Sequence, residues 1–203
     1  MDIWDVEGNA AEMFDRASVD PKEPVGVGTM VRRLLGKDGL CFVRRSTIVT
    51  SVAKLCKVSG SFRIYAKRDA PDLAFNIAHE LAEWRYWDET DDHKESACDA
   101  LAAAIVAPRP AFLRMLRLVG EDFAALAHAF KVSETSMALR LGETTDQPLV
   151  AITRNYHFVR GREWGWPAEP ELRRIASRGR QGIRRVRLTD DRMRVVLMAE
   201  DVV

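Results

Sequence analysis

The sequence has few cysteines and no long apolar segment, and both shortages narrow the class of protein. Its three cysteines, Cys41, Cys56 and Cys98, form no CxxC pair. Neither a disulfide framework nor a cysteine-based zinc ribbon is therefore expected. The longest apolar run, residues 100–107, is far shorter than the roughly 20 residues that span a bilayer. The acidic start also lacks the pattern of a secretory signal. We expect reduced thiols, no membrane partner and a cytoplasmic location.

The net charge is also close to zero, because 31 basic and 30 acidic residues give a formal charge of +1. The balance hides an uneven distribution. Residues 87–99 contain six acidic side chains against one lysine, whereas residues 154–194 contain twelve arginines, no lysine and five acidic residues. Such a basic tail is either a solvated surface or the binding surface for an acidic partner such as nucleic acid.

Apolar periodicity and turn residues predict an α+β fold in two parts. The expected domains are residues 1–142, a small and mostly helical domain with a short sheet, and residues 148–203, a small β-rich basic module. The stretch 142–148 is the predicted linker. Helices are expected at 9–18, 24–35, from Pro71, before Pro108, and at 110–118, 122–130, 133–141 and 169–177. Strands are expected at 39–44, 61–66 and 149–160, with a hairpin at 183–199, and residues 46–58 fit either a strand or a helix.

The helix expected after Pro71 has the most specific chemical signal in the chain. In the motif H-E-x-x-H, two histidines one helical turn apart bind zinc and the glutamate between them is the general base. Here His79 and Glu80 occupy the first two positions, and Glu83 replaces the second histidine. Residues four apart on a helix project from the same face, so His79 and Glu83 can still bind one ion.

The next predicted helix repeats this spacing with Glu95 and Asp99. We therefore predict one divalent metal ion bound by His79, Glu83 and Glu95. Asp99 would accept the remaining ring N–H of the histidine and fix its tautomer, and Glu80 would be the catalytic base. His93, two residues before Glu95, is an alternative ligand that could replace the missing histidine; the other interpretation is an exposed loop residue.

Two stretches around these residues resemble the ImmA/IrrE family of bacterial and phage metallopeptidases. They are 75–83, FNIAHELAE, and 95–108, ESACDALAAAIVAP, and the family pattern runs approximately F-x-I-A-H-E-L-x-H, then E-x-x-A-N-x-F-A-x-x-L-L-M-P. The E-x-x-x-D spacing also resembles the gluzincins. The similarity covers about residues 62–141 and is absent after about 148. It implies a zincin-like peptidase domain, a helix-turn-helix-like segment at 121–141, and cleavage of a repressor that controls mobile-element or stress genes.

Glu83 departs from that family pattern and leaves three functions open. Two carboxylates and one histidine nearly neutralise a divalent ion, so a water beside it is acidified less than in a two-histidine site. Oxygen ligands also shift the preference from zinc toward manganese. The protein is then an active peptidase with an altered site, a metal-binding regulator with weak activity, or a metal-free pseudo-peptidase that acts by binding protein or nucleic acid.

Two segments outside the metal-binding motif bear on what the protein binds. The second helix of the helix-turn-helix-like segment begins with Glu134, which would repel phosphate, so packing or a protein partner is expected there rather than DNA. The arginines of the tail are the better nucleic-acid candidates, with Trp164 and Trp166 as stacking groups. They are Arg173, Arg174, Arg178, Arg180, Arg184 and Arg185. The alternative is a small sheet that buries its apolar side chains and exposes these arginines.

Overall fold

The computed structural model describes residues 5–43, 51–70, 72–92, 94–145, 148–152, 157–160, 167–189 and 195–199. These residues form an α+β protein with eight helices and seven strands, as the sequence predicts. They divide into two compact units. Unit 1 is Met1–Leu118 with Ala129–Val132, and unit 2 is Val119–His128 with Ser133–Val203. This division differs from the predicted boundary at 142–148, because most of the helix-turn-helix-like segment belongs to unit 2.

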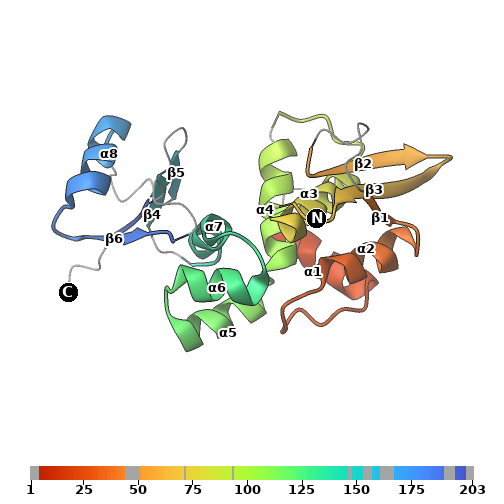
Figure 1. Cartoon of the computed structure of the whole chain (residues 1–203), viewed down its shortest axis with the longest axis horizontal. Coiled ribbons are helices and arrows are strands. Elements are labelled where there is room, and N and C mark those ends of the chain that lie inside the picture. Colours follow the sequence, from red (N-terminus) through yellow and green to blue (C-terminus); the bar gives the residue numbers. More distant parts are fainter. Residues whose placement is uncertain are drawn as a thin grey trace. The chain divides into compact units, whose positions relative to one another are not determined.

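Unit 1 contains the predicted metal site and consists of five helices and three strands (Figure 1). In chain order these are α1 (Val6–Arg16), α2 (Val27–Leu35), β1 (Leu40–Val43), β2 (Ala53–Val58), β3 (Ser61–Lys67), α3 (Leu73–Arg85), α4 (Lys94–Val106) and α5 (Arg109–Val119). All of the predicted helices and strands of this region are present. Gly36 ends α2 with φ of 91°, a conformation that glycine adopts without strain. The ambiguous segment 46–58 contains strand β2.

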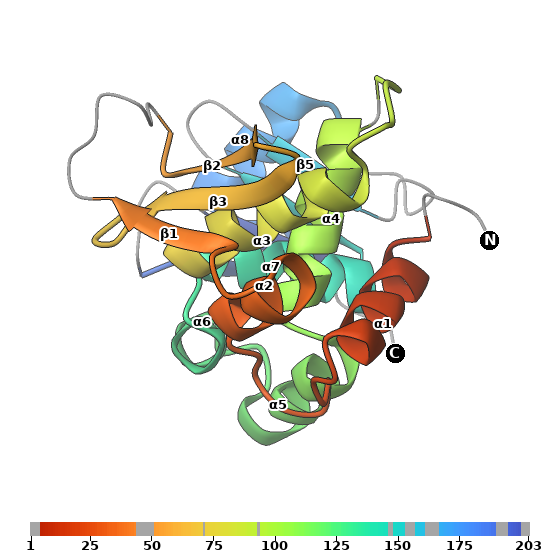
Figure 2. The same ribbon diagram turned by 90° about the vertical axis from the view of Figure 1, so that its right-hand side faces the viewer.

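The three strands form a sheet in the order β1-β3-β2, with β1 parallel and β2 antiparallel to β3. Ser59 and Gly60 join β2 to β3 with φ of 50° and 82°, and two positive φ angles suit a tight hairpin loop. Leu55 and Ile64 face each other in the ladder and are buried. Helix α3 packs against β2 and β3 (Figure 2). Among the described strands, β2 is therefore an edge of the sheet that lies against α3.

Helices α3 and α4 pack against each other. Their apolar side chains are buried in the core, and their polar side chains lie at the predicted metal site. Ile77 and Leu81 of α3 are buried, as the apolar stripe predicts. Helix α4 buries Cys98, Leu101 and a run of alanines, and such small side chains allow two helices to approach closely. The acidic positions of α4 remain on its exposed side, one turn apart. This packing brings the polar face of α3 next to the first turn of α4.

Unit 2 contains the second sheet, with the order β5-β4-β7-β6 and antiparallel pairing throughout. Leu172 and Ile175 of α8 pack on Ile183 and Leu197 of the sheet, and burial of these apolar side chains stabilises the unit. The described elements, some shared with unit 1, are α6 (Phe123–Phe130), α7 (Glu134–Thr144), β4 (Leu149–Ile152), β5 (His157–Arg160), α8 (Glu169–Arg178), β6 (Ile183–Arg187) and β7 (Val195–Ala199).

Two predictions for this region need correction. The single strand expected at 149–160 is two antiparallel strands, β4 and β5. The predicted linker at 142–148 begins too early, because α7 continues to Thr144, whose hydroxyl donates to the carbonyl of Arg140. Packing overrides the low helix propensity of Gly142, which is buried in this helix.

No single helix in the described part of the chain is long and apolar enough to cross a membrane. Helices α4 and α5 reach that length and composition only together, and they are bent by 63° at their junction. The apolar side chains of α4 are buried inside the protein, as in the core helix of a folded domain.

Candidate metal centre

Three predicted ligands converge at the contact between α3 and α4. His79 and Glu83 come from α3, and Glu95 comes from the first turn of α4. The Nε2 atom of His79 lies 3.8 Å from Oε1 of Glu83 and 3.6 Å from Oε2 of Glu95. All three ligand atoms lie within 4.8 Å of one another. Metal–ligand bonds of about 2.1 Å in a tetrahedral site separate ligand atoms by about 3.4 Å. This His/Glu/Glu group can therefore hold a metal ion after small movements of its side chains.

Asp99 lies on the other side of the histidine ring. Its Oδ1 atom is 2.9 Å from Nδ1 of His79. A carboxylate at this nitrogen holds the proton on Nδ1 and turns Nε2 toward Glu83 and Glu95. This is the supporting role predicted from the spacing of Glu95 and Asp99. The arrangement of ligand, ring and carboxylate fits a metal-binding histidine.

The electrostatics of the site favour a cation at this position. Burial lowers the pKa of His79, but hydrogen bonds and charge interactions with Asp99 and Glu83 outweigh it and raise this pKa to about 10. The hydrogen bond with His79 in turn lowers the pKa of Glu83 below its ordinary value, against the effect of burial. At neutral pH a proton on His79 therefore supplies the positive charge that the carboxylates attract, and a divalent ion would replace it.

Glu80 points toward the sheet rather than toward α4. Its Oε2 atom accepts a hydrogen bond from the backbone N–H of Leu55 on β2. Burial raises the pKa of Glu80 to about 7, aided by the charge of Glu83 and opposed by the Leu55 hydrogen bond and by His79. A carboxylate with a pKa near neutral pH can both accept and return a proton under physiological conditions. The predicted catalytic base thus lies between the ligand group and the edge strand.

Two further side chains bear on the ligand set. Cys98 is buried beside the site, and burial, together with the nearby Glu83 and Glu95 carboxylates, raises its pKa to about 12. Cys98 therefore stays a neutral thiol and is a poor ligand. His93, the alternative ligand, lies outside the described residues. The donor set available in the described part is one imidazole and two carboxylates, which suits a divalent ion.

The arginines predicted to bind nucleic acid mostly contact their own unit. Arg184 pairs with Glu121, and Arg185 donates to the carbonyls of Ala176 and Ser177 at the end of α8, at 3.2 and 2.7 Å. Glu171 accepts from Arg174 at 3.2 Å and lies 4.0 Å from Arg180. Arg173 is half-buried and Arg178 is exposed. Several of the predicted nucleic-acid contacts therefore have structural partners, and a surface with such internal pairing attracts phosphate less strongly.

Glu134 packs inside unit 2, in agreement with the expectation of packing rather than DNA contact at this helix. It is only 5% exposed, and its carboxylate accepts hydrogen bonds from the backbone N–H and the hydroxyl of Thr189. Ser133 caps α7 by accepting a hydrogen bond from the N–H of Ser136. The start of α7 thus anchors the segment that follows β6, which agrees with a packing role for this helix.

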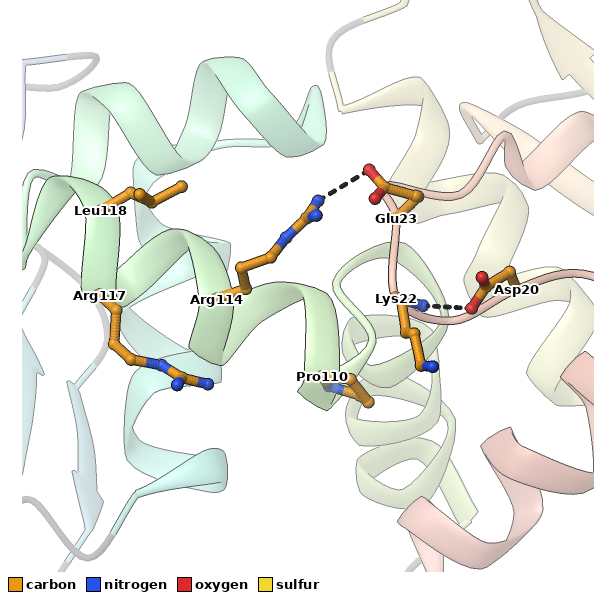
Figure 3. Close-up of a pocket in the computed structure, with 7 residues that line it drawn as sticks. All are labelled: Asp20, Lys22, Glu23, Pro110, Arg114, Arg117 and Leu118. Atoms are coloured by element: carbon orange, nitrogen blue, oxygen red, sulfur yellow. Dashed lines mark hydrogen bonds and ion pairs between the residues drawn. The ribbon is translucent and has the colours of Figure 1, made fainter.

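Two hollows in unit 1 lie outside the ligand group. One of about 480 Å³ lies between α5 and the loop before α2 (Figure 3). Arg114 crosses its rim and binds Glu23 at 2.7 Å, so its charges already compensate each other. The second, about 290 Å³, has mostly apolar walls from α2, β1, α3 and residues 129–131. Neither brings together groups with the acid, base or ligand chemistry found around His79.

No model of a known protein family matches the sequence, and no curated protein matches it either. A solved structure named as a Mycobacterium tuberculosis transcriptional regulator is similar, with a TM-score of 0.58, 15% sequence identity and 76% of this chain covered. The chain spans about half of that structure, 54% of its length. At this identity the similarity concerns the fold alone.

Proposed function

We propose that this protein is a metal-dependent peptidase that cleaves an extended segment of a regulatory protein. The observation that carries the proposal is the convergence of His79, Glu83 and Glu95 beside Glu80, which itself contacts an edge strand. The ion would be divalent, with zinc expected first and manganese second. The regulatory substrate, a helix-turn-helix repressor, rests only on the sequence resemblance to the ImmA/IrrE family.

The residues divide the chemical work among them. His79, Glu83 and Glu95 hold the ion, and Asp99 orients the histidine ring. An ion bound there would polarise a peptide carbonyl and acidify a water beside it. The Glu80 carboxylate would accept a proton from the attacking water and return it to the leaving amine. Burial, which raises the pKa of Glu80 above its ordinary value, favours the return of the proton.

The position of β2 favours a peptide substrate over a small molecule. Alternate residues of an edge strand direct N–H and C=O away from the neighbouring strand. The N–H of Leu55 binds Glu80 rather than β3, so Lys57, two residues further along, also directs its backbone outward. An extended peptide can add to such an edge through main-chain hydrogen bonds. It would then pass Glu80 with a peptide bond near the ligand group.

The alternative function is a pseudo-peptidase that binds a protein or nucleic acid without cleavage. Its specific support is Glu83, because a second carboxylate weakens the Lewis acidity of the site. The internal contacts of the tail arginines favour a protein partner over nucleic acid in this alternative. Incubating the zinc-loaded protein with a peptide library separates the two functions, since only the peptidase produces new amino termini.

The pKa of His79 predicts how metal affinity depends on pH. Below about pH 10 the ring holds a proton that the ion must displace from Nε2. Zinc should therefore bind about tenfold more tightly for each pH unit gained below that value. Competition with a chelator of known pH dependence at pH 7 and pH 8 measures this change.

Asp99→Asn is the matched variant for this measurement. It removes a carboxylate that raises the pKa of His79, so the pH above which zinc affinity stops rising should be lower in the variant than in the wild-type protein. Equal zinc affinity of the wild-type protein at pH 7 and pH 8 would show that the ion does not replace a proton on His79.

A further inference from the structure

A partly exposed pair of aromatic rings joins β3 to the residues after α3. Phe62 of β3 and Trp87 meet edge to face, with ring centroids 4.9 Å apart and planes inclined by 69°. Trp87 is 41% exposed, which is unusual for so large an apolar side chain. The ammonium group of Lys57 lies 5.3 Å from the centre of the Phe62 ring. The three side chains come from β2, β3 and the residues after α3.

This pair belongs to the same elements as the proposed catalytic base and its contact, the end of α3 and the hairpin of β2 and β3. Trp87 follows Glu83 by four residues and lies just beyond the end of α3 at Arg85. Lys57 follows Leu55 by two residues, which is about 7 Å along a strand, and Lys57 is the direct partner of Phe62 in the ladder. Side chains on one face of an extended peptide repeat at the same interval of two residues. A peptide that runs along β2 past Glu80 would therefore place a side chain beside Lys57, whose ammonium group lies over the Phe62 ring.

The ammonium group over the Phe62 ring bears on which substrate side chain fits. Lys57 already occupies the position over Phe62 where a cation is attracted to an aromatic ring. A basic substrate side chain would be repelled by this ammonium group. An uncharged aromatic or large aliphatic side chain would cover the exposed part of Trp87 and gain from its removal from water.

We infer that Phe62, Trp87 and Lys57 form a specificity subsite for a large, uncharged apolar side chain of the substrate. That side chain belongs to the residue two positions from the cleaved bond. The inference rests on the proposed peptidase function and adds a substrate preference to it. It also gives Lys57 a role, the exclusion of basic residues from this position.

The test uses zinc-loaded full-length protein and a library of random-sequence peptides, with cleavage positions identified by mass spectrometry. Peptides with Phe, Leu or Met two residues from the bond should be cleaved about 10-fold faster than those with Ser there. Trp87→Ala should remove this preference, and Trp87→Phe should retain most of it. Lys57→Glu should raise cleavage of peptides with Lys or Arg at that position several-fold.

Phe42→Ala is the matched control. Phe42 is also a partly exposed aromatic residue of the same sheet, on β1, and has Arg68 5.2 Å from its ring centre. It lies on the strand at the opposite side of the sheet from β2, so the variant should keep the wild-type preference. Thermal unfolding of each variant reports whether the fold is retained.

Different negative results would exclude either the subsite or the peptidase activity. Cleavage by the wild-type protein without a preference at this position, or with the same preference in Trp87→Ala and Lys57→Glu, would overturn the subsite and leave the peptidase intact. If no peptide is cleaved, binding of fluorescent peptides to the same proteins shows whether the subsite exists. Tighter binding of Phe peptides than Ser peptides, lost in Trp87→Ala, would keep the subsite and overturn the peptidase.

Discussion

Glu80→Gln should reduce peptide cleavage by about 100- to 10,000-fold while the protein retains its metal. The amide has the same shape as the carboxylate but cannot accept a proton from water. It can still accept the hydrogen bond from the backbone N–H of Leu55, which Glu80 accepts in the structure, so the position of the side chain should persist. Initial rates on a peptide substrate and metal content by mass spectrometry measure the two effects.

Glu23→Gln is a suitable control for this variant. Glu23 is a surface carboxylate of the same unit that pairs with Arg114, and surface pairs of this kind contribute little to stability. Its variant should cleave at the wild-type rate. If Glu80→Gln also cleaves at that rate, Glu80 is not the base and another group must activate water.

Glu95→Ala should lower zinc affinity by more than about 100-fold. Loss of a residue that only supports a ligand costs about 10- to 100-fold in affinity, and Glu95 is expected to bind the ion directly. Its side chain is 77% exposed, so the substitution should not disturb the core. Zinc titration against a competing chelator gives the affinity, and thermal unfolding checks the fold.

Asp99→Asn and Glu23→Ala complete this series. Asp99→Asn should lose affinity within the range of a supporting residue, and Glu23→Ala should lose none. If Glu95→Ala binds zinc as tightly as the wild-type protein, the third ligand comes from elsewhere, and His93 becomes the first residue to replace.

The helical part of the site could be predicted from the sequence because it depends on the spacing of residues that are close together in the chain. His79 and Glu83 are four residues apart, as are Glu95 and Asp99, and this spacing alone places each pair on one helix face. The contact of Nδ1 of His79 with Asp99 follows once two consecutive helices pack side by side. Gly36 and Ser133 are likewise single residue types with a fixed conformational role, and they mark the end of α2 and the start of α7.

The contribution of the sheet could not be predicted in this way. Residues 53–58 alternate only weakly in polarity, so the segment did not distinguish strand from helix. The contact between Glu80 and Leu55 joins residues 25 positions apart, and the Phe62–Trp87 pair also depends on tertiary packing. The same limit applies to the tail, where the arginine count was visible but the partners of Arg184 and Arg185 were not.

The most direct test of the proposed peptidase is cleavage by the wild-type protein with and without its metal. Zinc-loaded protein incubated with random-sequence peptides should produce new amino termini, removal of the ion by a chelator should stop this, and added zinc or manganese should restore it. Glu80→Gln, prepared in parallel, detects any contaminating protease. The proposed function is contradicted if the metal-loaded wild-type protein yields no more new termini than Glu80→Gln, or if the chelator does not change the yield.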